Sequence, residues 1–264
     1  MIESVDQMGQ VHRFAERPNR IVSLVPSITE LLVDLGVRPR SAMQPSGTAH
    51  SASEQNLVGC TKFCVHPVNL KTETAIVGGT KNVKRLAVEA LKPDLIIASK
   101  EENVKEQVEG LQATCPVWVS DVVDIESGAK MNLLLGELFG VPNTAQQINA
   151  ANAQSLARHQ QAKLGTALYF IWKDPYMSVG GDTYIDDVLR QLGYENACGA
   201  QKRYPTLTEA EIKSIAPDHI LLSSEPFPFK DQHIGELREL CPKADIRLVD
   251  GEFFSWYGSR MGKL

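Results

Sequence analysis

Several features that mark specialised classes of protein are missing from this chain of 264 residues. No apolar run approaches the length of about 18 residues that a membrane-spanning helix needs. The net charge of −5 comes without a basic face or tail, which argues against a nucleic-acid partner. With 43% hydrophobic and 22% charged residues, the composition is that of a globular protein with one large domain or two small ones.

Catalytic and secretory signatures are also lacking. The sequence contains no GxGxxG, GxxxxGK[ST], GxSxG or HExxH, so phosphate-loop, hydrolase and zincin activities have no support. The first twenty residues are polar and do not resemble a secretory signal. Five cysteines are odd in number and too sparse for a disulfide scaffold, which suits a reducing compartment. These features predict a cytoplasmic location; a periplasmic location is the alternative if a signal has been removed.

Cys60, Cys64 and His66 form a short cluster of soft metal ligands, which could indicate a metal site. Structural zinc sites pair such a cluster with a second, distant one, which this sequence does not have. In a strand the three side chains would share one face, as buried core residues also do. We therefore expect no metal site here.

Short apolar runs alternate with amphipathic segments, the pattern of a parallel α/β fold. Predicted strands cover residues 21–25, 75–77, 95–98, 117–119, 168–171, 220–222 and 246–249. Ser27 with Glu30, and Thr208 with Glu211, have the spacing of a capping box at a helix start. The small, polar segment 41–56 is predicted to be a surface loop.

The order of these segments repeats along the chain. Lys-Pro-Asp at 92–94 and Ala-Pro-Asp at 216–218 each precede an apolar strand. Cys-Pro pairs at 115–116 and 241–242 precede the next strand, and segment 30–36 resembles segment 187–193. Three matches in one order predict two similar lobes. The Ala- and Gln-rich segment 144–164 predicts one stiff helix of about 30 Å between them. The domains expected are 1–125, a connecting part 126–164, and 165–264.

Candidate site residues follow the strands, because open parallel sheets bind ligands beyond the carboxyl ends of their strands. The first lobe contributes Lys62, Phe63, Thr80, Lys81, Glu101 and Glu102, and the second contributes Trp172, Tyr176, Glu225, Asp250, Glu252, Trp256 and Arg260. Aromatic rings beside charged groups suit a ligand with a flat body and polar edges. The alternative is that the aromatic residues are local core and the charged residues form helix starts or ordinary ion pairs.

The segment Arg-Ile-Val-Ser-Leu-Val-Pro-Ser-Ile-Thr-Glu-Leu-Leu from Arg20, the Lys-Pro-Asp-Leu-Ile-Ile strand and the central helix resemble class III solute-binding proteins. These helical-backbone receptors serve ABC import of metal chelates, and the vitamin B12-binding branch is the most similar. The resemblance implies two Rossmann-like α/β lobes joined by one long helix. It also implies a monomer that captures a corrinoid (cobalamin) or ferric siderophore-type chelate between its lobes, with no cofactor and no catalytic residue of its own.

Site roles follow from the same resemblance. Phe63 matches an aromatic residue that stacks on the ligand, with Tyr204 and the 172–176 loop as partners from the second lobe. The 250–260 loop matches one that reaches the ligand's edge. Such receptors dock on an ABC permease through an acidic residue on each lobe. Glu209 and Glu211 fit this pattern, whereas Lys84 and Arg85 are basic, which predicts that the protein does not stimulate a cobalamin importer.

Two other functions remain open at this stage. The ionisable residues at the strand ends would suit acid–base chemistry in a cytosolic enzyme or cofactor-handling protein on the same scaffold. A protein-interaction module is a third interpretation.

Overall fold

The computed structural model describes residues 1–40 and 55–264, which form two compact units. Unit 1 comprises Met1–Val122, Ser127–Ala151 and Tyr257–Arg260. Unit 2 comprises Val123–Glu126, Asn152–Trp256 and Met261–Leu264. Residues 126–164 therefore contribute to both units, and the predicted boundaries at 125 and 164 stay predictions. Most of the predicted 41–56 loop lies outside the described residues, and Asn56 already belongs to a strand.

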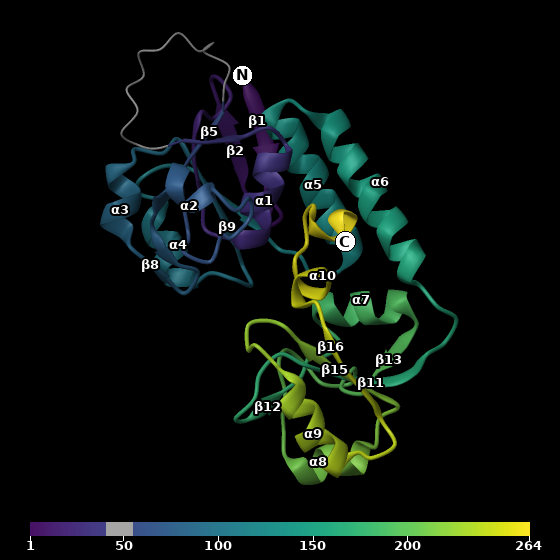
Figure 1. The fold of residues 1–264 in the computed structure, drawn as a ribbon. Helices are drawn as coiled ribbons and strands as arrows, with labels where there is room; N and C mark the ends of the chain where they lie inside the picture. Colours follow the sequence, from purple (N-terminus) through teal and green to yellow (C-terminus); the bar gives the residue numbers. More distant parts are fainter. Residues whose placement is uncertain (41–54) are drawn as a thin grey trace. The chain divides into compact units, whose positions relative to one another are not determined.

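Unit 1 is built on a parallel sheet (Figure 1). Its strands run in the order β10 (Val117–Ser120), β9 (Leu95–Ser99), β3 (Arg20–Ser23), β5 (Asn56–Cys60) and β4 (Arg38–Pro39), with β6 (Ala75–Ile76) also paired to β5. Two antiparallel pairs accompany it: β1 (Ile2–Val5) with β2 (Val11–Phe14), and β7 (Gly78–Gly79) with β8 (Asn82–Val83).

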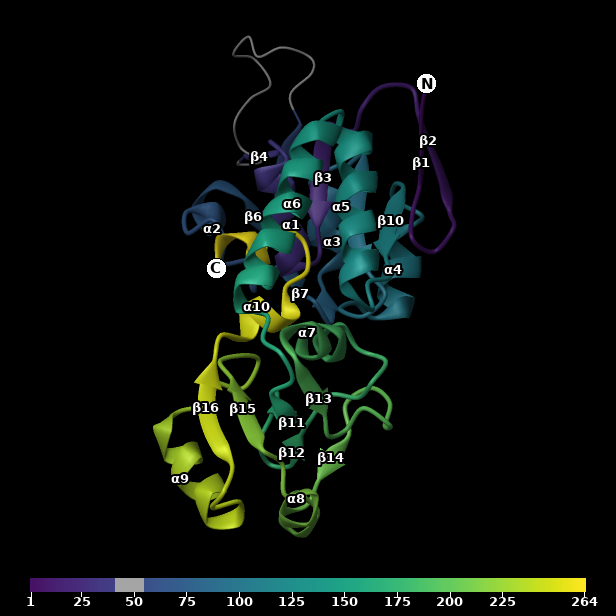
Figure 2. The ribbon, with the colours of Figure 1, turned by 90° about the vertical axis from the view of Figure 1, so that its right-hand side faces the viewer.

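Helices cover both faces of this sheet. On one face Val22 and Ile96 pack against Val88 of α3 (Arg85–Ala90) and Val108 of α4 (Lys105–Leu111). Helix α5 (Ile125–Phe139) lies on the opposite side of the sheet from α3 (Figures 1 and 2). Unit 1 also contains α1 (Pro26–Asp34), the short α2 (Leu70–Glu73) and the first part of α6 (Pro142–His159).

Unit 2 has a second parallel sheet, of the order β13 (Tyr194–Asn196), β11 (Gly165–Phe170), β15 (His219–Ser223) and β16 (Asp245–Val249). The short strands β12 (Tyr176–Met177) and β14 (Thr206–Leu207) pair antiparallel. The helices are α7 (Tyr184–Leu192), α8 (Glu209–Ile215), α9 (Asp231–Leu240) and α10 (Gly251–Ser255), and a 3₁₀ turn covers Arg260–Lys263.

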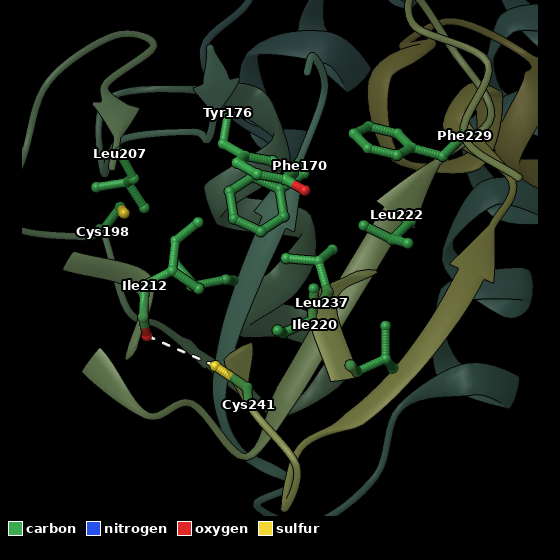
Figure 3. Close-up of a cluster of buried hydrophobic side chains, with 12 residues drawn as sticks. Phe170, Tyr176, Cys198, Leu207, Ile212, Ile220, Leu222, Phe229, Leu237 and Cys241 are labelled. Atoms are coloured by element: carbon green, nitrogen blue, oxygen red, sulfur yellow. Dashed lines mark hydrogen bonds between the residues drawn. The ribbon is translucent and has the colours of Figure 1, made fainter. Parts of the chain in front are cut away.

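Alternate side chains of its strands face opposite layers, as the strand period of two requires. Leu168, Phe170 and Leu222 pack with Ile212 of α8 and Leu237 of α9 (Figure 3). Their neighbours Tyr169 and Leu221 pack instead with residues of α7 and α10. Each unit is thus an α/β layer structure, and the predicted fold class is confirmed.

The repeat in the sequence corresponds to a repeat in topology. In chain order β3, β5, β9 and β10 occupy the same places in their sheet as β11, β13, β15 and β16 in theirs. The repeated aspartates also have the same role. Asp94 accepts hydrogen bonds from the backbone N–H groups of Asn19 and Arg20, and Asp218 accepts them from Thr166 N–H and Oγ1. Each carboxylate therefore ties the start of its own strand to the start of the neighbouring one.

Two helix predictions were partly wrong. The predicted 144–164 helix is α6 (Pro142–His159), which ends earlier. Lys163 and Gly165 have positive φ values of 37° and 104°, which a right-handed helix cannot contain. The Thr208–Glu211 capping box is confirmed, with both reciprocal hydrogen bonds. The Ser27–Glu30 box is wrong, because α1 already begins at Pro26, a residue suited to the first helical position.

The Cys60–Cys64–His66 segment is not one strand. Cys60 ends β5, and Cys64 follows a turn in which its N–H donates to the Thr61 carbonyl (3.1 Å). Within residues 1–40 and 55–264, no group of three potential metal ligands comes together. Over the same residues, no helix is both long and apolar enough to span a membrane.

Candidate functional site

The loop after β5 presents an aromatic ring outside the core of unit 1. Phe63 is 49% exposed. Its ring lies over Gly79, so closely that a Cβ there would approach Phe63 Cε2 to 3.2 Å. The Lys62 ammonium lies 4.9 Å from the centroid of the same ring, within the range of a cation–π contact. The Lys62 N–H donates to the Gly78 carbonyl (2.8 Å), which fixes this loop to the β7–β8 turn.

The β7–β8 turn is fixed in turn to the loop after β9. Lys81 Nζ donates to the Glu101 carbonyl (2.8 Å), and Gln107 Nε2 donates to the Lys81 carbonyl (3.0 Å). Thr80 is buried, whereas Lys81 is exposed. Glu101 and Glu102 are half-buried. The structure thus brings Lys62, Phe63, Thr80, Lys81 and Glu101 together on connected loops of unit 1.

Asn103 holds these loops, and sequence reasoning did not select it. Its buried amide donates to the carbonyls of Leu24 (3.3 Å) and Thr80 (3.0 Å), and its Oδ1 accepts from Ser99 N–H (2.8 Å). One side chain therefore satisfies backbone groups at the ends of β3 and β9 and in the β7–β8 turn. Its position just after β9 was the available signal, but an amide is more often solvated there.

In unit 2 the aromatic residues divide between surface and core. Trp172, just beyond β11, is 41% exposed and meets Phe227 edge to face at 5.6 Å. Tyr176 is 8% exposed and packs on Phe170 at 5.2 Å within the cluster of Figure 3. Tyr204 is half-buried, with the Arg203 guanidinium 5.6 Å from its ring centroid.

Trp256 and Glu225 form a buried polar contact. Trp256 is 7% exposed, and its Nε1–H donates to Glu225 Oε1 (2.7 Å), which also accepts from Ser255 Oγ (2.9 Å). Burial raises the pKa of Glu225, the nearby carboxylates of Glu252 and Asp250 add to the rise, and the two hydrogen bonds oppose it. Asp250 caps α10 by accepting from Glu252 N–H (2.9 Å).

Arg260 lies within unit 1 and is buried. Its Nε and Nη2 contact Glu30 Oε2 and Oε1 at 3.0 and 2.9 Å, a bidentate ion pair. The side chain expected at the edge of a ligand is thus engaged with a carboxylate of α1 in this structure.

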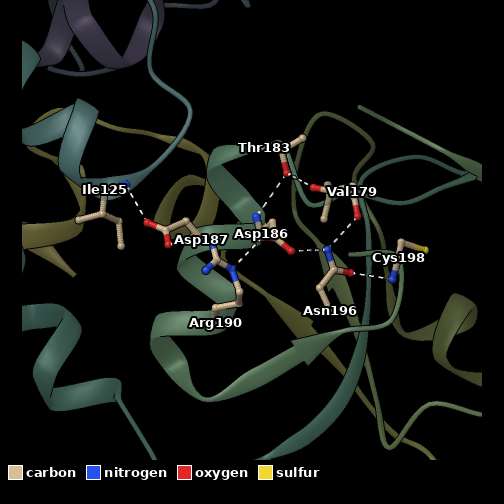
Figure 4. Close-up of polar contacts among 9 residues, drawn as sticks. Ile125, Val179, Thr183, Asp186, Asp187, Arg190, Asn196 and Cys198 are labelled. Atoms are coloured by element: carbon tan, nitrogen blue, oxygen red, sulfur yellow. Dashed lines mark hydrogen bonds and ion pairs between the residues drawn. The ribbon is translucent and has the colours of Figure 1, made fainter. Parts of the chain in front are cut away.

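A cavity of about 830 Å³ opens beside β13 in unit 2, and no predicted site residue lines it. The polar side chains around it satisfy one another (Figure 4). Asp186 pairs with Arg190 Nε (2.9 Å) and accepts from Asn196 Nδ2 (2.8 Å), while Asn196 Oδ1 accepts from Cys198 N–H (3.0 Å). This network fixes α7 to β13 and the chain beyond it, which is a role in folding.

Comparison with known proteins connects this geometry to a family. Residues 21–238 match the family model described as periplasmic binding protein. An uncharacterized ABC transporter substrate-binding lipoprotein of Bacillus subtilis (strain 168) is 25% identical over 229 residues, or 82% of this chain and 67% of that protein.

Solved structures share the fold. A periplasmic heme-binding protein from Pseudomonas aeruginosa gives a TM-score of 0.73 at 22% identity, covering 93% of this chain and 89% of that chain. The periplasmic vitamin B12-binding protein of Vibrio cholerae gives 0.72 at 16% identity, covering 94% and 93%. At these identities the likeness is one of fold.

Proposed function

The chain belongs to the periplasmic binding protein family, and on that premise we propose that it captures a metal chelate of the corrinoid, heme or ferric siderophore kind. The resemblance to class III solute-binding proteins is confirmed by the family match and by the folds of the heme- and vitamin B12-binding neighbours. Members of this family are solute-binding proteins, so the enzyme alternative is not favoured.

The observation that carries the proposal is the exposed ring of Phe63. A ring that is half open to solvent, with one edge next to a glycine, leaves apolar surface on which a planar ligand can stack. Stacking on such a face contributes about 0.5–1.5 kcal/mol beyond the burial of apolar area. Lys62, over the same ring, supplies a cation for the acidic edge groups of a chelate. Both side chains are exposed, which a purely structural role does not require.

The other residues of the proposed binding surface differ in how exposed they are and in how far they are engaged in contacts within their own unit. Thr80, Lys81, Glu101 and Glu102 belong to the loops connected to Phe63, and Trp172 offers a second exposed ring in unit 2. Tyr204, Glu252 and Asp250 follow as polar or half-buried candidates. Tyr176, Glu225, Trp256 and Arg260 are proposed with less support, since each is engaged within its own unit.

Export and an ABC permease partner are part of the proposal. The relatives are named as periplasmic proteins or as a lipoprotein, so the predicted cytoplasmic location has no support among them. The prediction from Lys84 and Arg85 stays open. Arg85 Nε pairs with Glu89 Oε1 at 2.6 Å, and Glu211 is engaged in the capping box of α8, which leaves Glu209 as the more accessible acid there.

The test is ligand titration of Phe63→Ala. Cyanocobalamin, hemin and a ferric siderophore would each be titrated against wild type and variant, with melting curves recorded in parallel. We expect one chelate to bind the wild type, and the variant to lose about tenfold or more in affinity, which corresponds to about 1.4 kcal/mol. The melting temperature should change little.

Leu86→Ala is the matched control, because Leu86 is an exposed apolar residue of α3. It should leave the affinity unchanged, and Phe63→Leu would separate ring stacking from apolar area. If no chelate binds the wild type below millimolar concentration, or if Phe63→Ala lowers only the melting temperature, the proposal is wrong.

A further inference from the structure

Two buried thiols flank the loop that carries Lys62 and Phe63. Cys60 is the last residue of β5, and Cys64 returns beneath the loop through the turn at Thr61. Both side chains are completely buried, whereas Lys62 and Phe63 between them are exposed. The sequence favoured plain core over a metal site for these cysteines.

The surroundings of Cys64 are polar. Its Sγ lies 3.2 Å from Thr29 Oγ1 and 3.3 Å from Thr61 Oγ1, and the thiol of Cys60 is near enough to interact with it. A core cysteine normally packs among apolar groups, as a small hydrophobic residue. Here two hydroxyl groups contact one sulfur, and a second buried thiol lies beside it.

From this geometry we propose that Cys60 and Cys64 are a redox pair that closes into an intrachain disulfide when an external disulfide, such as oxidised glutathione, acts as oxidant. The link would join the end of β5 to the far side of the loop and so restrict the backbone that carries Phe63. The proposal depends only on the two cysteines and holds whatever ligand the protein binds.

The chemistry is thiol–disulfide exchange in two steps. The Cys64 thiolate attacks one sulfur of the external disulfide, whose S–S bond breaks and releases one glutathione thiolate. The Cys60 thiol then loses its proton, and its sulfur attacks Cys64 Sγ, releasing the second glutathione thiolate. The two protein thiols lose two electrons and two protons, and the external disulfide is reduced to two thiols.

The hydrogen bonds assign the first step to Cys64. Burial raises the pKa of Cys64, but the hydrogen bonds from Cys60, Thr29 and Thr61 together bring it below the ordinary value of 9.0. The hydrogen bond with Cys64, together with burial, raises the pKa of Cys60. Because the thiolate is the nucleophile, Cys64 should react first. Since both thiols are buried, the loop at 61–63 has to open locally before the exchange.

The full-length protein offers a direct test, because trypsin cuts after Lys62, between the two cysteines. The folded protein would be incubated with oxidised glutathione, its remaining thiols alkylated, and the chain digested and analysed by mass spectrometry. We expect peptide 41–62 and peptide 63–71 to appear as one linked species, two hydrogen atoms lighter than their sum. Reduction with dithiothreitol should separate them.

Variants distinguish the pair from general oxidation. Cys60→Ser should accumulate a glutathione adduct on Cys64, Cys64→Ser should give much less adduct on Cys60, and Cys115→Ser should still form the linked peptides. The wild-type experiment does not depend on whether a substituted chain folds, so its result alone decides the question. If Cys60 and Cys64 remain alkylated as free thiols while the urea-unfolded chain is oxidised under the same conditions, the redox pair does not exist.

Discussion

Phe63 in unit 1 and Trp256 in unit 2 were predicted as ligand-binding aromatic residues by the same reasoning, yet one ring is exposed and the other is buried. Phe63 is 49% exposed and rests on a glycine. Trp256 is 7% exposed, and its Nε1–H donates to the half-buried carboxylate of Glu225. An aromatic residue beyond a strand end is therefore a candidate for ligand binding only when its ring stays open and its polar atom is not already committed.

The two units share an order of strands and differ in the loops that follow those strands. Four strands of each sheet have the same order, and Asp94 and Asp218 accept hydrogen bonds at the starts of equivalent strands. The loops at the strand ends do not repeat. After β5 the loop leaves Lys62 and Phe63 exposed, whereas after β13, the strand in the equivalent place, Cys198 is buried in the core. Function in such a duplicated fold has to be sought in the loops, because the strands are devoted to packing.

The largest expected difference is in stability. Trp256→Ala removes a buried ring and one of the hydrogen-bond donors to the Glu225 carboxylate, so it should destabilise the protein by about 3–5 kcal/mol. Phe63→Ala removes a half-exposed ring and should cost far less. Urea unfolding midpoints of the two variants and the wild type would measure this contrast. Equal midpoints for both variants would break the distinction between the two rings.

A smaller effect is expected from the two capping-box sequences, one in each unit. Thr208→Ala removes the hydroxyl that accepts from Glu211 N–H, which should cost about 1 kcal/mol. Ser27→Ala removes no capping hydrogen bond, because the N-cap of α1 is Val25. The same unfolding measurement should show a clear loss for Thr208→Ala and a smaller one for Ser27→Ala. A larger loss for Ser27→Ala would mean that its hydroxyl has a role which the hydrogen bonds of α1 do not reveal.

These capping boxes illustrate how far the sequence could lead. Strands β9 and β15 were predictable because each is a short apolar run after a Pro-Asp pair, and the duplication followed from their order. The Ser27 spacing was misleading because the helix begins two residues earlier than it predicts, at Pro26. The Glu30–Arg260 ion pair joins residues 230 positions apart, and no local pattern indicates such a contact. Whether Trp256 is buried likewise depends on the packing of α10, which periodicity does not report.

The two units also contain buried or half-buried carboxylates with opposite pKa shifts. In unit 1, Asp6 is desolvated, but hydrogen bonds from His12 and from the N–H groups of Gln10 and Val119 lower its pKa. In unit 2, burial raises the pKa of Glu225. The folded state therefore favours the ionised form of Asp6 and the protonated form of Glu225. Asp6 contributes stability above its ordinary pKa of 3.8, and this contribution is lost as the pH falls through the lowered value.

For Glu225 the sign is reversed, which gives the smallest and most specific prediction. Because its pKa is higher in the folded than in the unfolded chain, the folded state binds more protons between the ordinary value of 4.5 and the raised value. Stability contributed by this group is thus lost as the pH rises through that window.

Glu225→Gln keeps the side-chain shape and an oxygen that can accept from Trp256 and Ser255, but it cannot ionise. The urea midpoint of the variant should therefore fall less than that of the wild type between pH 4.5 and neutrality. Asp6→Asn is the control, since it should lower stability by a constant amount above pH 3.8 and change the pH dependence only below that value. If Glu225→Gln and wild type lose stability in parallel above pH 4.5, the Glu225 carboxylate is as well solvated in the folded protein as in the unfolded chain.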